Sequence, residues 1–238
     1  MRKLTNRQES GPPARAADTA LTAEVEVPES SRLALWEIAS VVTSCLIAEW
    51  VVLSFAGGSK LVGAAPVLLA VGFMLYSHRE RGETAYEIGF RVDNFLAACR
   101  LLLLPTAILL LLVLGLAWFT QPGLFNTPWR ARFLLLPLWA LFQQYALNGF
   151  INRRAQLALG KGRKSVLLVA VVFSLLHFPN PLLAALTFVG GFVWAAVYQR
   201  QPNLFALALS HAVSSPSLAL TVSPTLLNSL RVGFKYFG

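Results

Sequence analysis

The side chains of this chain that could do chemistry lie inside strongly apolar stretches of its second half. Gln143 and Gln144 occupy one stretch, His177 ends the next, and His211 lies in a third. An imidazole can take up a proton near neutral pH or bind a metal ion, whereas an amide only donates and accepts hydrogen bonds. Because polar side chains are costly inside a bilayer, we expect these groups to converge on one wet pocket.

Helical spacing adds two polar groups to this set. Gln144 and Asn148 are four residues apart and share a helix face, as do His211 and Ser215. Taken singly, a buried amide more often bonds a neighbouring helix than takes part in chemistry. The combination of amides, imidazoles and a hydroxyl on three successive apolar segments favours a functional pocket instead. A serine nucleophile at Ser215 has little support, because no acid is placed to orient His211.

Composition places the pocket in a membrane protein. The 238 residues are 56% hydrophobic and only 13% charged, whereas soluble domains carry about 25% charged residues. Cys45 and Cys99 both lie in apolar stretches and offer neither a disulfide framework nor a thiolate metal site. The net charge of +9 comes from basic residues between the apolar runs. Membrane lipids with anionic headgroups are therefore the expected partners, and nucleic acid is not.

The apolar runs predict an all-α, polytopic transmembrane bundle of about seven to eight spans. Residues 1–31 are polar and predict a disordered cytoplasmic tail, so residues 32–238 form a single transmembrane domain. The expected spans lie at about 34–56, 61–77, 95–119, 132–152, 164–178, 181–199, 203–222 and 224–237.

The distribution of basic residues predicts the orientation. With the N-terminus in the cytoplasm, 16 Lys and Arg residues fall on the cytoplasmic side and three on the opposite side, with Arg100 inside a span. This bias follows the positive-inside rule for membrane proteins. We expect a multi-pass protein with a cytoplasmic N-terminus, in a bacterial cytoplasmic membrane.

The polar groups also form an ordered set of motifs. The chain carries Gln143-Gln144-x-x-x-Asn148-Gly149, then Phe173-x-x-x-His177, then His211-x-x-x-Ser215. Residues 143, 177 and 211 are separated by equal gaps of 34 residues. Order, spacing and flanking sequence over about residues 130–220 resemble the CAAX protease and bacteriocin-processing (CPBP, or ABI) family. That family carries Glu-Glu-x-x-x-Arg-Gly, Phe-x-x-x-His and His-x-x-x-Asn on successive helices.

The resemblance implies an intramembrane endopeptidase that cleaves a hydrophobic or prenylated peptide. In the family, the first Glu and the His residues activate a water directly or through a bound metal, and the Asn stabilises the oxyanion. Carried over to this chain, the resemblance implies catalytic roles at Gln143, Gln144, His177, His211 and Ser215, with Asn148 and Phe173 in the pocket. It likewise implies that His177 and His211 would hold a metal, Zn²⁺. Glu49 lies outside the motifs, but it is deep enough in the first predicted span to face the same pocket.

The chain departs from the family at four motif positions. Both Glu positions are Gln, the Arg position is Asn148, and the final Asn position is Ser215. An amide cannot act as a general base near pH 7, and the only acids in the predicted spans are Glu37 and Glu49. Two functions therefore stay open: an active endopeptidase, and an inactive pseudoprotease that binds membrane peptides in bacteriocin immunity or membrane-protein handling. A small transporter is a third and weaker alternative.

Overall fold

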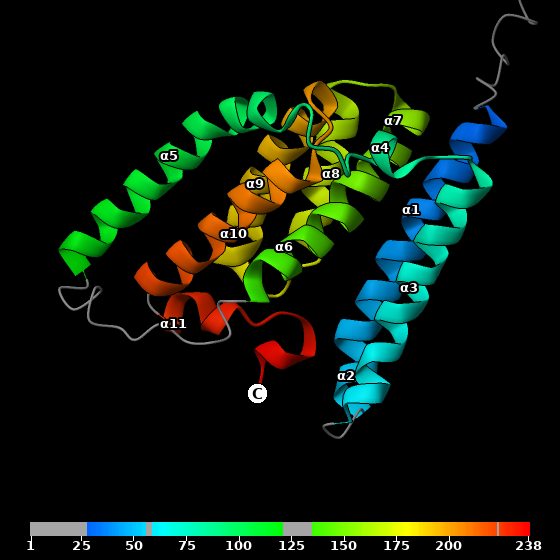
Figure 1. Cartoon of the computed structure of the whole chain (residues 1–238). Coiled ribbons are helices and arrows are strands. Elements are labelled where there is room, and N and C mark those ends of the chain that lie inside the picture. The colour runs from blue at the N-terminus through cyan, green and yellow to red at the C-terminus, as the bar shows by residue number, and fades with distance from the viewer. Residues whose placement is uncertain (1–27, 56–58, 121–134, 223) are drawn as a thin grey trace, which may run out of the picture.

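The computed structural model describes residues 28–55, 59–120, 135–222 and 224–238, and every regular element within these ranges is helical (Figure 1). The predicted tail lies outside the described residues up to residue 27, and the first helix already begins at Glu29. The elements in chain order are α1 (Glu29–Ile47), a π-helical turn (Ala48–Val52), α2 (Leu53–Phe55), α3 (Lys60–Glu80), α4 (Ala85–Ile88), α5 (Phe95–Thr120), α6 (Leu136–Gln144), a π-helical segment (Tyr145–Asn152), α7 (Arg153–Leu159), α8 (Arg163–Leu175), α9 (Pro181–Arg200), α10 (Leu204–Thr221), α11 (Pro224–Leu227) and two 3-10 turns (Asn228–Leu230 and Gly233–Tyr236).

Five helices in the described part of the chain are long and apolar enough to cross a membrane. They are Glu29–Phe55, Leu61–Glu80, Phe95–Gly115, Pro181–Arg200 and Leu204–Thr221. These five match predicted spans, so the all-helical membrane fold is confirmed at this level. The predicted spans at 132–152 and 164–178 correspond to α6 with its π-helical segment and to α8, and the total of seven to eight stays a prediction.

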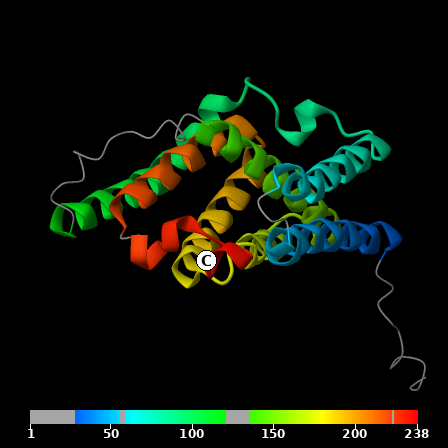
Figure 2. The ribbon, with the colours of Figure 1, turned by 90° about the horizontal axis from the view of Figure 1, so that it is seen from below.

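The predicted span at 224–237 does not form a continuous helix. α11 ends at Leu227, and Asn228, Ser229 and Leu230 all take positive φ angles of 43°, 54° and 61°. This segment also bonds to the turn after α8, because Asn180 Nδ2 donates to Leu227 O at 2.7 Å and Gly233 N donates to Phe178 O at 2.9 Å. The C-terminal segment therefore lies under the bundle, as Figure 2 shows from below.

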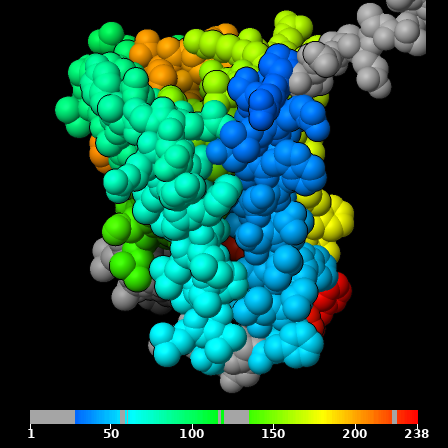
Figure 3. Space-filling view, turned by 90° about the vertical axis from the view of Figure 1, so that its right-hand side faces the viewer, coloured from blue at the N-terminus to red at the C-terminus, as the bar shows by residue number. Residues whose placement is uncertain are grey.

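The helices form two groups joined at their ends. α1 and α3 run side by side, while α6, α8, α9 and α10 form the main bundle, with α5 packed along α10 (Figure 1). α1 also packs against α7 at one end of the molecule. Figure 3 shows the face made by α1 and α3, where atoms of the C-terminal segment are visible in a hollow between the two helices.

Asparagine side chains cap the starts of α9 and α10. Asn180 Oδ1 accepts a hydrogen bond from Leu183 N at 3.1 Å and starts α9, with Pro181 at the first helical position. Asn203 Oδ1 accepts from Ala206 N at 2.8 Å and starts α10 in the same way. Asparagine at the N-cap and proline directly after it are both favoured at helix starts. These caps fix where α9 and α10 begin and hence the depth of the residues they carry.

A buried ion network joins α1 and α3 to α7. Arg154 is fully buried, and its guanidinium donates to both carboxylate oxygens of Glu83 at 3.0 and 2.9 Å. The same guanidinium donates to Ser77 Oγ at 3.0 Å, and its Nε lies 3.0 Å from a carboxylate oxygen of Glu37. Buried charges are tolerated only when they are paired in this way. The network fixes the α1–α3 pair to the bundle.

Two further arginines extend this network. Arg81 pairs with Glu37 at 2.7 Å, and Arg153 pairs with Glu83 at 2.6 Å. Arg81, Arg153 and Arg154 are among the 16 basic residues predicted to lie on the cytoplasmic side and set the topology. The structure adds a second role, because all three arginines are bound to carboxylates of α1 and of the loop after α3.

The network predicts a loss of stability in acid. Burial raises the pKa of Glu83, but hydrogen bonds from His78, Arg154 and Arg153 outweigh it and hold the pKa well below its ordinary value. Because the pKa of Glu83 is lower in the folded than in the unfolded protein, its ionised carboxylate stabilises the fold at pH values above the unfolded-state pKa. This stabilisation is lost as the pH falls below the unfolded-state pKa. We expect the Tm in detergent to fall by several degrees from about pH 5 to about pH 3. Glu83→Gln should flatten this dependence, whereas Glu80→Gln, at an exposed position, should not; equal curves for all three proteins would contradict the assignment.

Candidate functional site

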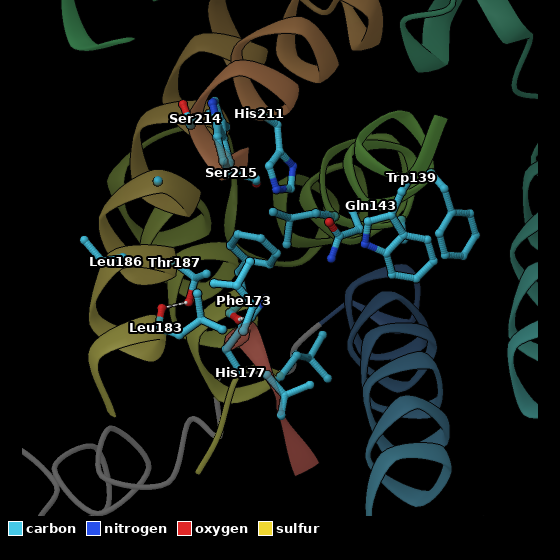
Figure 4. A pocket seen from close by; sticks show the side chains of 18 of the residues that line it. Trp139, Gln143, Phe173, His177, Leu183, Leu186, Thr187, His211, Ser214 and Ser215 are labelled. Carbon is cyan, nitrogen blue, oxygen red and sulfur yellow. Dashed lines mark hydrogen bonds between the residues drawn. The ribbon is translucent and has the colours of Figure 1, made fainter. Parts of the chain in front are cut away.

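A cavity of about 640 Å³ lies between the α1–α3 pair and the main bundle. Its lining is mostly apolar and includes six of the eight predicted site residues: Glu49, Gln143, Phe173, His177, His211 and Ser215. Figure 4 shows that Gln143, Phe173, His177 and His211 come from α6, α8, the turn after α8, and α10. The structure therefore brings together motif residues that are far apart in the sequence.

The remaining two predicted site residues, Gln144 and Asn148, do not line the cavity. Both are fully buried inside the bundle, where Asn148 Nδ2 donates to Gln144 Oε1 at 2.7 Å. The shared helix face of this pair is confirmed, but the expectation that both side chains point into the cavity is not met. Gln144 contacts His211, which lines the cavity, and Asn148 is linked to His211 only through Gln144.

His177 is held by the end of α8. Its Nδ1 lies 2.7 Å from the carbonyl oxygen of Phe173, and its ring packs edge-on against the Phe173 ring at 4.7 Å. A backbone carbonyl can only accept a hydrogen bond, so Nδ1 carries the proton. The other ring nitrogen, Nε2, therefore has a free lone pair. His177 is equipped to accept a proton in the cavity.

His211 lies on α10 and is held from two sides, by residues of α9 and α6. Its ring stacks on Trp194 with centroids 4.4 Å apart and an interplanar angle of 30°. Its Nδ1 lies 3.2 Å from Gln144 Nε2. Trp194 is itself fixed, because its Nε1 donates to Ser210 Oγ at 3.1 Å. The His211 ring thus has a defined orientation at the cavity wall.

Trp194 was not predicted as a site residue, although it both lines the cavity and stacks on His211. A tryptophan in an apolar helix has a polar N–H that needs a partner when it is buried. The need for a hydrogen-bond partner, together with Ser210 on the following helix, could have indicated that Trp194 packs beside His211.

Glu49 lies in the π-helical turn Ala48–Val52 and lines the same cavity. Its Oε2 is buried and has no hydrogen-bond partner among the described residues. The C-terminal segment approaches so closely that a Cβ at Gly233 would lie 2.8 Å from Glu49 Cβ, and Gly233 has a φ of +55°. Short π-helical turns occur often at functional sites, and the one at Glu49 places a carboxyl group in the cavity wall.

The residues of the cavity fit a catalytic zinc ion poorly. Within the described ranges, no three His, Cys, Asp or Glu side chains gather where they could hold a metal ion. Catalytic zinc sites use three protein ligands, whereas His177 and His211 supply two at most. A metal at this site would need donors that the described residues do not bring together.

The fold and the cavity define a class: an integral membrane protein of apolar helices that enclose a histidine-containing pocket. Within this class, the chain belongs to the type II CAAX prenyl endopeptidase Rce1-like family, whose model matches residues 87–215. The match confirms the resemblance drawn from the motifs and identifies the chain as a member of a family of intramembrane endopeptidases. It begins upstream of the predicted core at 130–220 and takes in α5. No curated protein and no solved structure matches the chain.

Proposed function

We propose that this protein hydrolyses a peptide bond of a hydrophobic or C-terminally prenylated peptide inside the membrane, with His177 as the general base. The observation that carries the proposal is the hydrogen bond from His177 Nδ1 to Phe173 O at 2.7 Å. This bond leaves Nε2 as a proton acceptor in the cavity wall. An imidazole base can replace the missing motif glutamates, because its unperturbed pKa lies near neutral pH.

The residues of the cavity would carry out the reaction in three steps. His177 Nε2 takes a proton from a water molecule while the water oxygen attacks the carbonyl carbon of the peptide. The carbonyl oxygen becomes an oxyanion, which the amide of Gln143 and the hydroxyl of Ser215 can stabilise as neutral donors. The C–N bond then breaks, and the proton held by His177 passes to the leaving amine.

The lining of the cavity supports a lipid-like or strongly apolar substrate. Leu109, Leu112, Val189 and Leu218 are among its many apolar side chains, and its volume is about 640 Å³. A binding site of this size buries an apolar chain mainly through the hydrophobic effect. We further propose that the N-terminus and the basic loops face the cytoplasm of a bacterial cell, within a bundle of seven or eight spans in its cytoplasmic membrane.

A second candidate function is binding of the same peptide without cleavage. The observation that favours it is that neutral amides, Gln144 and Asn148, occupy the positions of the family's second Glu and its Arg. Both amides bond to each other inside the bundle and offer no base to the cavity. A neutral motif of this kind is compatible with a retained fold that has lost its chemistry.

Turnover separates the two functions. We would measure cleavage of a fluorogenic, C-terminally prenylated peptide by the purified protein in detergent, for wild type and for Gln143→Glu. We expect wild type to cleave, and Gln143→Glu to cleave about 10-fold faster or more, because a carboxylate in the cavity wall adds a second base. An unprenylated peptide of the same sequence is the substrate control.

The outcomes differ for each function. If wild type binds the peptide but does not cleave it, and Gln143→Glu does cleave it, the natural protein is a binder and the first proposal is wrong. If neither protein binds or cleaves the prenylated peptide, the proposed substrate class is wrong.

A further inference from the structure

A row of buried amides runs through the bundle behind the cavity. Gln144, Asn148 and Asn152 follow one another at intervals of four residues, and all three are fully buried. Asn152 Nδ2 donates to Asn148 Oδ1 at 2.9 Å, and Asn148 Nδ2 donates to Gln144 Oε1 at 2.7 Å. We call these three residues together with Gln199 the amide ladder. Its far end lies beside the loop between α7 and α8, and its near end contacts His211.

Backbone groups fix the direction of every hydrogen bond in the ladder. Gly162 N donates to Gln199 Oε1 at 2.9 Å, and a backbone N–H can only donate. Gln199 must therefore turn its Nε2 toward Asn152, where it donates to Oδ1 at 3.1 Å. A second backbone group agrees, because Asn152 Nδ2 donates to the carbonyl of Ala195 at 3.2 Å, and a carbonyl can only accept.

This direction is passed on to His211. Since Asn152 donates to Asn148, Asn148 has only its Nδ2 left for Gln144, and Gln144 has only its Nε2 left for His211. Gln144 Nε2 faces His211 Nδ1 at 3.2 Å. An amide nitrogen is a donor, so Nδ1 must accept and cannot carry a proton of its own. A neutral His211 then carries its single ring proton on Nε2.

We propose that Asn152 and Gln199 are positioning residues that fix His211 as a hydrogen-bond donor through Nε2. Figure 4 shows the His211 ring at the wall of the cavity that His177 also lines. The two histidines then have opposite tautomers: His177 offers a lone pair, and His211 offers an N–H. On the proposed function, the partner of His211 is an acceptor such as the peptide carbonyl oxygen. A cation is not, because Nε2 has no free lone pair.

The tautomer can be read directly by NMR of the folded protein, whether or not any peptide is cleaved. The ring ¹⁵N and ¹³C shifts of full-length protein labelled at histidine distinguish the two tautomers. The chain has three His residues, so His177→Gln and His78→Gln assign the signals. We expect His211 to carry its proton on Nε2 and His177 on Nδ1. A proton on Nδ1 of His211 would overturn the proposal.

Asn152→Asp tests the role of the ladder at a distance from the cavity. An aspartate at this position accepts from Gln199 and cannot donate to Asn148, so Asn148 and Gln144 turn over. Gln144 Oε1 then faces His211, and the proton of His211 moves to Nδ1. If this variant does not fold, Asn148→Asp imposes the same reversal one step closer to His211.

Gln156→Met is the matched control. Gln156 Nε2 donates to Asn152 Oδ1 at 3.2 Å but lies outside the path from Gly162 to His211. We expect it to leave the His211 tautomer unchanged. An unchanged tautomer in a folded Asn152→Asp or Asn148→Asp protein would show that the ladder does not position His211, and a reversed tautomer would support the proposal even if no peptide were cleaved.

Discussion

His177→Ala is expected to reduce peptide cleavage by a factor of about 10² to 10⁴, the usual contribution of a positioned general base. The variant removes an imidazole whose bond to Phe173 O leaves the Nε2 lone pair free in the cavity. Because the role is proton transfer, the loss should appear in kcat, with KM for the prenylated peptide changed little. Steady-state kinetics in detergent measure both constants.

Thr187→Val provides a control in the same cavity. Thr187 lines the cavity, but its hydroxyl already donates to Leu183 O in its own helix, as the dashed line in Figure 4 shows. This variant should keep kcat within a factor of about three. If His177→Ala retains wild-type kcat, His177 is not the base, and Glu49 becomes the next residue to replace because it is the acid that lines the cavity.

Arg154→Met is expected to destabilise the protein by about 3 kcal/mol, because breaking a buried ion pair leaves uncompensated buried charge. Arg154 is fully buried and contacts Glu83, Ser77 and Glu37. For a chain of this length, such a loss corresponds to a Tm lower by about 10 °C. Thermal unfolding in detergent measures it.

Two further variants test whether the loss of stability comes from the ion network or simply from replacing an arginine. Arg163→Met removes a cation of the same size at an exposed position at the start of α8 and should change Tm by less than about 2 °C. The double variant Arg154→Met with Glu83→Gln should recover part of the loss, because it also removes one of the two carboxylates that Arg154 contacts. An Arg154→Met protein as stable as wild type would mean that Arg154 does not hold α1 and α3 to the bundle.

The helices and the cavity were largely predictable from the sequence. Apolar runs predict the long helices because the bilayer demands about 20 apolar residues for each span. Asn-Pro and Pro-Asn turns predict the starts of α9 and α10 because these residues cap helices. Motif order and equal spacing predict that Gln143, His177 and His211 meet, and the structure places all three in one cavity.

The ion network was harder to predict because its members are far apart in the sequence. Arg154 and Glu83 are separated by 71 positions, and a pair of arginines beside a loop is typical of a topology signal. One clue was present: the chain has no Asp or Glu after Asp93. A buried arginine in the second half must therefore pair with a carboxylate from the first half.

The amide ladder was only half predictable. The spacing of Gln144 and Asn148 predicts a shared face, and Asn152 continues it at the same interval. Whether each amide donates or accepts depends on two backbone groups, at Gly162 and Ala195, that tertiary structure alone brings into contact. For this reason the sequence predicts a pocket containing Gln144 and Asn148, whereas the structure places both behind the pocket wall.

The short α8 has a consequence for where in the bilayer the chemistry takes place. Its 13 residues rise about 20 Å, which is less than the roughly 30 Å of hydrocarbon in a bilayer. If α8 runs along the bilayer normal with Arg163 at the headgroup level, His177 lies about two thirds of the way across the hydrocarbon. On the proposed function, both the hydrolytic water and the polar end of the peptide would have to reach that depth. Hydrophobic thickness would then help to set the rate, and lipids of different acyl length should give different turnover.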